Sequence, residues 1–179
     1  GGLRRINGVL PIALELRKRK CKKIILPFQN APEASFIDGI EVYPVRSLYE
    51  AVCFLNQDIE LKPYREEESR IWKKASTYEV DFSEVKNQYF VKRALTVAAA
   101  GAHNILLIGP PGAGKTMLAK RIPTILPDME FEEILDTTKI YSISGLLSQD
   151  RPLITRRPFR SPHHTSSNIS LVGGGSLPK

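Results

Sequence analysis

Cysteines and long apolar runs are scarce in this sequence. Only Cys21 and Cys53 occur, with no CxxC pair and no metal-ligand spacing, which argues against a disulfide framework and against a zinc site. No apolar run approaches the roughly 20 residues that cross a bilayer, and the N-terminus has no apolar signal-peptide core. These absences favour a cytoplasmic protein with reduced thiols and no membrane partner.

Charge of one sign is in modest excess. The chain has 26 Lys+Arg against 19 Asp+Glu, a net charge of +7, which suits a polyanion such as nucleic acid without identifying one. Its 179 residues are 42% hydrophobic and 25% charged, typical of one medium globular domain or parts of two. Because the sequence lacks an initiator Met and stops in the glycine-rich stretch 173–179, we expect a fragment of a longer protein.

The first part of the chain, residues 1–57, alternates helical and strand patterns. In order, these predict a helix over 11–20, a strand over 23–26, a helix capped by Asn30, a strand over 40–45, and a helix over 48–56 opened by a Ser47–Glu50 capping box. Such an alternation favours an α/β fold with helices on at least one face of a sheet.

The composition changes at residues 58–79, where five basic and six acidic residues crowd together. We interpret this stretch as a charged linker, partly helical, that Trp72 could anchor. A second domain is expected over 80–179. Its patterns predict a helix ending at Gly101, a buried parallel strand over 105–108, a helix over 115–122 and another over 131–140.

A glycine-rich phosphate-binding loop of the Walker A type, GxxxxGKT, lies between the predicted strand 105–108 and the helix that follows. Glycines let the backbone turn so that successive amides converge on phosphate oxygens, and the helix directs its positive end at the same site. Lys115, the catalytic candidate, can reach the β- and γ-phosphates of ATP, and the Thr116 hydroxyl can ligate Mg²⁺. The predicted nucleotide-binding residues are Gly109, Pro110, Pro111, Gly112, Ala113, Gly114, Lys115, Thr116 and Met117.

ATP hydrolysis also requires an acidic residue at the end of a second apolar strand to hold Mg²⁺ and position water. No such strand follows Thr116 in this sequence. The acidic residues nearest in sequence fall on a predicted loop and an amphipathic helix, where a structural role suits them better: Asp128, Glu130, Glu132, Glu133 and Asp136. The sequence therefore predicts nucleotide binding, and leaves hydrolysis by this piece alone in doubt.

Several segments together resemble one family. The stretches 81–88, 98–104 and 109–118 look like the AAA+ core of magnesium-chelatase-like ATPases. The segments Arg-Pro-Phe-Arg-Ser-Pro-His-His-Thr at 157–165 and Leu-Val-Gly-Gly-Gly at 171–175 narrow the resemblance to the YifB/ComM branch, over nearly the whole chain. Asn87 departs from the pattern, since relatives usually carry Gly there.

The resemblance implies a hexameric AAA+ ATPase that acts on DNA as a branch-migration helicase in natural transformation. The acidic metal-binding strand, the sensors and the arginine finger would then lie beyond Lys179. It also implies that residues 1–57 are the C-terminal half of a Lon-protease-like domain, of the ribosomal S5 domain 2-like fold. Where Lon has a catalytic Lys, this sequence has Leu10, whose aliphatic side chain can transfer no proton.

Basic residues gather in the second domain between Arg151 and His164. Arg156, Arg157, Arg160, His163 and His164 are the candidate DNA contacts, and the alternatives are pairing with a neighbouring subunit or a solvated face. A metal site at the two adjacent histidines is disfavoured, because neighbouring side chains on an extended chain point in opposite directions. The basic run 17–23 is interpreted as a solvated helix end.

Two other functions stay open at the level of sequence. One is a magnesium-chelatase-type motor subunit that drives metal insertion into a porphyrin; the Lon-like segment favours the YifB/ComM branch instead. The other is a regulatory module that binds nucleotide without hydrolysing it.

Overall fold

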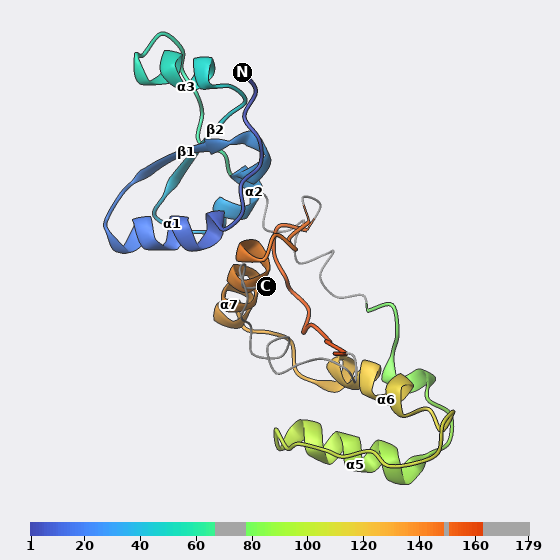
Figure 1. Cartoon of the computed structure of the whole chain (residues 1–179). Helices are drawn as coiled ribbons and strands as arrows, with labels where there is room; N and C mark the ends of the chain where they lie inside the picture. Colours follow the sequence, from blue (N-terminus) through green and yellow to red (C-terminus); the bar gives the residue numbers. More distant parts are fainter. Residues whose placement is uncertain (67–77, 149–150, 163–179) are drawn as a thin grey trace.

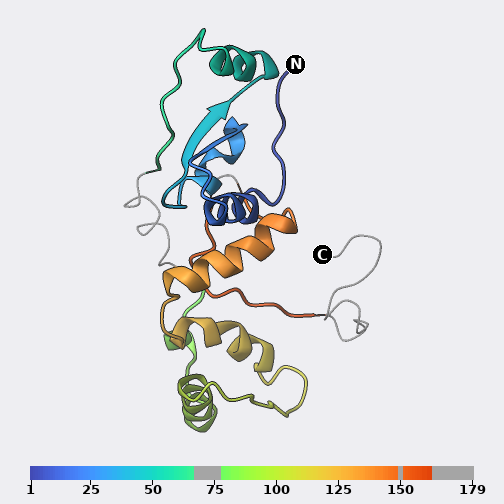
Figure 2. The same ribbon diagram turned by 90° about the vertical axis from the view of Figure 1, so that its left-hand side faces the viewer.

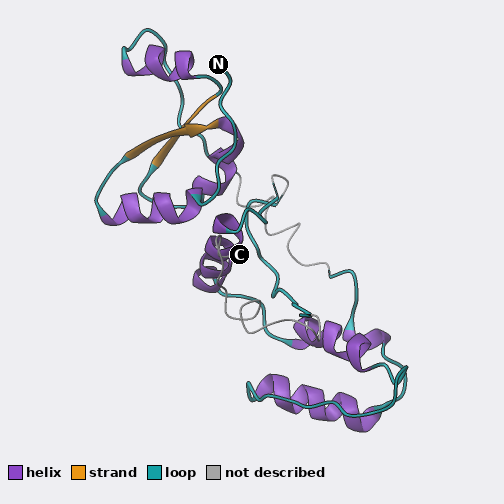
Figure 3. Cartoon of the chain, viewed as in Figure 1, coloured by secondary structure: helices purple, strands orange, loops and turns teal. Residues whose placement is uncertain are grey.

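The computed structural model describes residues 1–66, 78–148 and 151–162. Its described elements fall into two groups: a mixed helix–strand unit formed by the N-terminal residues, and a helical part that carries the glycine-rich loop (Figures 1 and 3). No described helix has the length and apolar character that crossing a membrane demands. The predicted linker anchor, Trp72, lies outside the described residues.

The N-terminal unit is built on a short parallel sheet. Strand β1 (Lys23–Pro27) pairs with β2 (Glu41–Val45), with Lys23 opposite Glu41 and Pro27 opposite Val45. The crossover between them contains the 3-10 turn η1 (Phe28–Asn30) and helix α2 (Ala31–Ala34), as a parallel pair requires. Helix α1 (Val9–Lys18) completes the core. The predicted α/β character of this segment is confirmed, and the buried core residues are Val9, Leu10, Ala13, Leu26, Ala31, Ala34, Ile37 and Val42.

The capping prediction for the helix after β2 is largely confirmed. Helix α3 (Leu48–Leu55) begins after Ser47, whose Oγ accepts a hydrogen bond from the Glu50 amide at 3.1 Å. The Glu50 carboxylate reaches back to the Arg46 amide at 2.6 Å, one residue before the cap. The first bond satisfies an amide that the first turn of a helix leaves without a partner, and the second ties the preceding residue to that turn.

The prediction that Asn30 caps the second helix is wrong. Its side chain makes no capping bond to α2; instead Oδ1 accepts from the Ile6 amide at 3.1 Å and Nδ2 donates to the Ile6 carbonyl at 2.9 Å. Because η1 leads into α2 with helical backbone angles at Asn30, the side chain is turned to the N-terminal segment. The fully buried amide therefore holds residues 5–7 against the unit.

The second group begins with the 3-10 turn η2 (Phe82–Glu84), followed by α5 (Tyr89–Ala100), which ends at Gly101 as predicted. Helix α6 (Lys115–Arg121) starts at the glycine-rich loop and continues into the 3-10 turn η3 (Ile122–Ile125); α7 (Phe131–Ile143) follows. A small core lies between η2, α5 and α6, and its buried residues are Phe82, Val85, Leu95 and Leu118.

The predicted buried strand over 105–108 is not formed. The segment joins no sheet among the described residues, and Leu106 and Ile108 are 81% and 87% exposed. Only Leu107 packs against the Leu95–Leu118 core. A central parallel strand needs hydrogen-bonding neighbours and cover on both faces, and here α5 covers one face alone.

Helix α7 lies against α1 and so connects the two groups (Figures 1 and 2). The Gly8 amide donates to the Ser142 carbonyl at 3.1 Å, and the Ser142 hydroxyl donates to the buried Glu33 carboxylate. Leu135 of α7 also packs on the N-terminal core. The division into 1–57, 58–79 and 80–179 stays a prediction, and direct contacts cross it.

Candidate nucleotide-binding site

The glycine-rich loop adopts a conformation that its glycines permit. Gly112 and Gly114 have φ angles of +81° and +78°, in the left-handed region that L side chains rarely adopt. A Cβ on Gly114 would also stand 3.2 Å from Met117 Cε. The sequence places glycine at both positions where the backbone must turn before α6.

Two loop amides are available to an anion. The Gly112 and Gly114 amides donate to no acceptor in the part of the chain that the structure describes, whereas the Ala113 amide bonds to the Pro110 carbonyl at 3.3 Å. Gly114 directly precedes α6, whose first-turn amides add positive character at the same place. These donors fit an oxygen-rich, negatively charged group such as a polyphosphate.

The Lys115 ammonium is held over the loop rather than extended into solvent. Its Nζ donates to the Gly109 carbonyl at 2.7 Å and to the Pro110 carbonyl at 2.8 Å. Both acceptors are neutral carbonyls, and no acidic side chain of the described residues pairs with the charge. Thr116 follows on the first turn of α6, exposed on the surface, where its hydroxyl is accessible to a metal-bound phosphate.

A cavity of about 490 Å³ opens beside the loop. Lys115, Gly109, Pro110 and Ala113 form its polar end, and apolar side chains of α5, α6 and the 105–108 segment form the rest: Phe90, Val91, Leu107, Ile108 and Leu118, with Gln88 at the edge. A charged end and an apolar end match the two halves of a nucleotide, phosphate and base.

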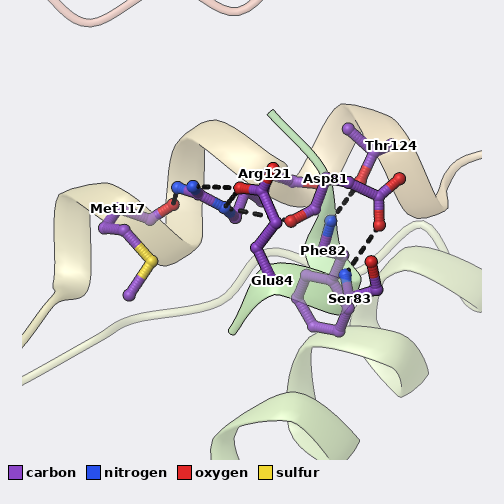
Figure 4. A network of polar contacts seen from close by, with 7 residues as sticks. All are labelled: Asp81, Phe82, Ser83, Glu84, Met117, Arg121 and Thr124. Atoms are coloured by element: carbon purple, nitrogen blue, oxygen red, sulfur yellow. Dashed lines mark hydrogen bonds and ion pairs between the residues drawn. The ribbon is translucent and has the colours of Figure 1, made fainter. Parts of the chain in front are cut away.

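Arg121 fastens the start of the second group to α6 (Figure 4). Its guanidinium donates to the Asp81 carbonyl at 3.0 Å, to the Met117 carbonyl at 3.2 Å and to the Glu84 carboxylate at 2.5 Å. The Phe82 amide donates to Thr124 Oγ1 at 3.1 Å. These bonds fix η2 against the helix that begins at the loop.

The same contacts change the acidity of η2. The Arg121 hydrogen bond lowers the pKa of Glu84 below its ordinary value, and the Ser83 side chain and amide lower that of Asp81. Both carboxylates stay ionised at neutral pH, so Glu84 keeps its ion pair with Arg121 and Asp81 keeps its hydrogen bond with the Ser83 amide. Sequence reasoning missed Arg121; its only signal was a basic residue at the end of a short helix.

The departure at Asn87 falls on a constrained backbone. Asn87 and Gln88 have φ angles of 57° and 54°, both left-handed, directly before α5. Asparagine tolerates this region better than most non-glycine residues. The turn that leads to the cavity is therefore formed with asparagine in place.

The candidate DNA contacts are placed only in part. Arg157 donates to Glu133 at 2.9 Å and to the Pro127 carbonyl at 2.8 Å. Arg156 lies 5.7 Å from the Tyr78 ring centroid, and Arg160 lies 5.1 Å from that of Tyr141. His163 and His164 lie outside the described residues.

Three of the five acidic residues expected to be structural have structural contacts in the described part of the chain. Glu133 forms a capping box with Glu130 at the start of α7 and also pairs with Arg157. Asp136 pairs with Lys139 at 2.6 Å. Among the described residues, no cluster of three or more acidic, His or Cys side chains could hold a metal ion.

An apolar segment, a glycine-rich turn and a helix that opens with a Lys-Thr pair are the parts of a P-loop. Comparison with known proteins gives the family: residues 81–179 match the description "Magnesium chelatase, subunit ChlI". The chain belongs to this magnesium-chelatase family.

Full-length relatives agree with that assignment. The chain is 40% identical over 183 residues to competence protein ComM of Haemophilus influenzae, covering 100% of this chain and 35% of the relative. It is 40% identical over 178 residues to YifB of Escherichia coli, and 45% identical over 178 residues to Rv2897c of Mycobacterium tuberculosis; these matches cover 99% and 98% of this chain and 34% of each relative. The chain thus spans about a third of the length of these relatives.

A shorter match reaches a protease. Archaeal Lon protease of Archaeoglobus fulgidus is 42% identical over 52 residues, 29% of this chain and 8% of the relative. Leu10, which by the resemblance stands where Lon has its catalytic lysine, is fully buried in the core of the N-terminal unit. An aliphatic side chain buried there has a packing role and no acid–base chemistry.

Proposed function

We propose that this chain is the ATP-binding part of an AAA+ ATPase that, in the full-length protein, hydrolyses ATP and remodels DNA as a hexameric ring. The observation that carries the proposal is the loop itself. It has two left-handed glycines, two amides without an acceptor among the described residues, and the Lys115 ammonium at the end of one cavity. Family membership and the resemblance to ComM support the motor part of the proposal.

The residues of the loop fit a Mg²⁺–ATP complex. The amides of Gly112 and Gly114 would donate to phosphate oxygens, and Lys115 would exchange its two loop carbonyls for the terminal phosphates. The Thr116 hydroxyl would complete the metal's ligands, and the apolar end of the cavity would hold the base. Bound Mg²⁺ would neutralise the charge that develops on the transferred phosphate.

We propose DNA as the second ligand. We also propose a cytoplasmic location. The chain's excess of positive charge supports this partner. Arg156 and Arg160 remain candidate contacts on the described surface. Arg157 is engaged by Glu133, so its first role is to hold the segment after residue 151 against α7.

The test is the ATP hydrolysis rate of the full-length protein, with and without single-stranded and branched DNA. We expect DNA to stimulate hydrolysis, and Lys115→Ala to lower the rate about 100-fold or more, since a fixed cation beside the developing phosphate charge is lost. Lys120→Ala is the matched control, because this exposed lysine lies on the same helix away from the cavity. It should leave the rate unchanged.

Other outcomes favour the other functions. Hydrolysis that depends on Lys115 but ignores every DNA tested would indicate a chelatase-type motor that acts on another substrate. Tight ATP binding with no hydrolysis in the full-length protein would indicate a regulatory module.

A further inference from the structure

The positive charge of this chain is concentrated in its first 30 residues. They contain eight basic residues and one acidic residue, Glu15, which leaves +7; this equals the net charge of the entire chain. The remaining residues, 31–179, sum to zero charge, because the acidic residues before Arg151 offset the basic segment that follows it. The N-terminal unit therefore carries a dense local excess of positive charge, of the kind that attracts a polyanion.

Six of those eight cations form one exposed group at the end of α1 and in the turn to β1. We call it the 17–23 cluster: Arg17, Lys18, Arg19, Lys20, Lys22 and Lys23. Arg19 pairs with Glu15 at 2.9 Å and Lys23 lies 5.7 Å from the Tyr43 ring centroid. The other four make no ion pair with any described acidic side chain.

Stabilisation of a helix end does not account for this group. Cations in the last turn of a helix favour its negative end, and Arg17 and Lys18 occupy that turn. Lys20, Lys22 and Lys23 lie beyond it, where the effect has faded. These three lysines therefore have either another structural role or a ligand.

The backbone at Lys20 adds an independent observation. After α1 the chain turns with Lys20 at φ 62°, and the amides of Lys20 and Cys21 donate to the Arg17 and Leu16 carbonyls. Glycine is the usual residue at this left-handed position, because a side chain there costs free energy. This chain carries a lysine instead, and its side chain is exposed.

We propose that the 17–23 cluster binds the phosphate backbone of DNA without reading its sequence. Resting on the proposed action on DNA, the inference moves the main electrostatic contact from the arginine-rich segment to the N-terminal unit. Point charges on flexible lysines suit phosphates rather than base edges. A membrane surface is disfavoured, since no large apolar side chain is exposed between residues 17 and 23 to enter lipid.

The experiment measures binding of the full-length protein to a DNA duplex of about 30 base pairs, roughly 100 Å long, at several salt concentrations. One variant combines Arg17→Ala, Lys18→Ala, Lys20→Gly and Lys22→Ala. Each lost phosphate contact lowers the slope of log K against log salt by about 0.9, so the expected decrease is about 3 to 4. Affinity should fall by about tenfold or more for every duplex sequence.

Two further variants separate charge from folding. Lys20→Gly alone removes one cation and suits the left-handed backbone, so it should weaken DNA binding without weakening the fold. Lys62→Ala is the matched control: it is exposed in the same unit, and the antiparallel bridge between Val42 and Tyr64 directs it toward the other end of β2. It should leave the slope unchanged.

The outcomes distinguish this inference from the proposed function. A reduced slope in the combined variant, with ATP binding retained, supports the cluster as the DNA surface. An unchanged slope in a protein that still binds DNA overturns the inference and leaves the proposed function standing. A native protein that binds no DNA, or binds only anionic vesicles, overturns both.

Discussion

At the scale of single residues, the loop and its approach depend on where the backbone must be left-handed. Glycine occupies the left-handed positions 112 and 114 of the loop, whereas the left-handed positions before α5 are occupied by Asn87 and Gln88, which carry side chains. A left-handed residue other than glycine costs roughly 1–2 kcal/mol, less for asparagine, whose short polar side chain can bond locally. The left-handed backbone of the Asn87 turn, which leads to the cavity, therefore lowers the stability of the folded chain.

We predict that Asn87→Gly raises the stability of the protein slightly, by up to about 1 kcal/mol, and leaves ATP affinity unchanged. Asn87→Val should lower stability by about 1–2 kcal/mol, because a β-branched side chain strongly disfavours this backbone region. Urea unfolding of the three proteins checks both. Equal stability of all three would show that the turn relaxes without cost.

At the scale of elements, Arg121 determines how η2 sits on α6. The Arg121 guanidinium lowers the pKa of Glu84, so the folded carboxyl holds its proton less tightly than the unfolded one. The stabilisation is therefore complete above the ordinary pKa of 4.5 and is lost as pH falls through the lower folded value. Acid should loosen η2 before it affects the apolar core.

We predict that Glu84→Gln lowers the melting temperature at pH 7, and that this effect shrinks as pH falls below the ordinary pKa of 4.5 and through the lowered folded value, where the folded carboxyl is protonated as well. Thermal melts of both proteins across that pH range provide the test. Glu132→Gln, a change of an exposed carboxylate in the first turn of α7, serves as a control. A difference between the Glu84 proteins that stays constant down to pH 3 would contradict the ion-pair explanation.

The elements also show what the sequence could predict. Ser47 and Glu50 bond within four residues of each other, and Gly101 ends α5, so these helix limits follow from local chemistry. The segment 105–108 has the composition of a buried strand, but a strand forms only with partners that its own sequence does not contain. The loop glycines and Lys115 were predictable as a motif; the apolar end of the cavity was not, because it brings together side chains from three segments.

At the scale of the whole molecule, a small polar junction joins the two groups of elements. The buried Glu33 carboxylate accepts from the Leu10 amide at 3.0 Å and from the Ser142 hydroxyl, and the Arg5 guanidinium lies 4.0 Å away. Glu33 and Ser142 are 109 residues apart in the sequence, so no local pattern could reveal the pair. Because α7 follows η3 and α6, the junction lies two elements from the phosphate loop.

We predict that Ser142→Ala destabilises the protein by about 1–3 kcal/mol, because a buried carboxylate loses one of its donors. The loss should appear as weaker coupling: calorimetry should resolve two transitions where the native protein has one, with the first belonging to the α5–α6 part. Ser144→Ala, two residues on and without a side-chain bond in the described structure, should leave the single transition intact. Two transitions already present in the native protein would mean that the Glu33–Ser142 junction does not couple the two groups.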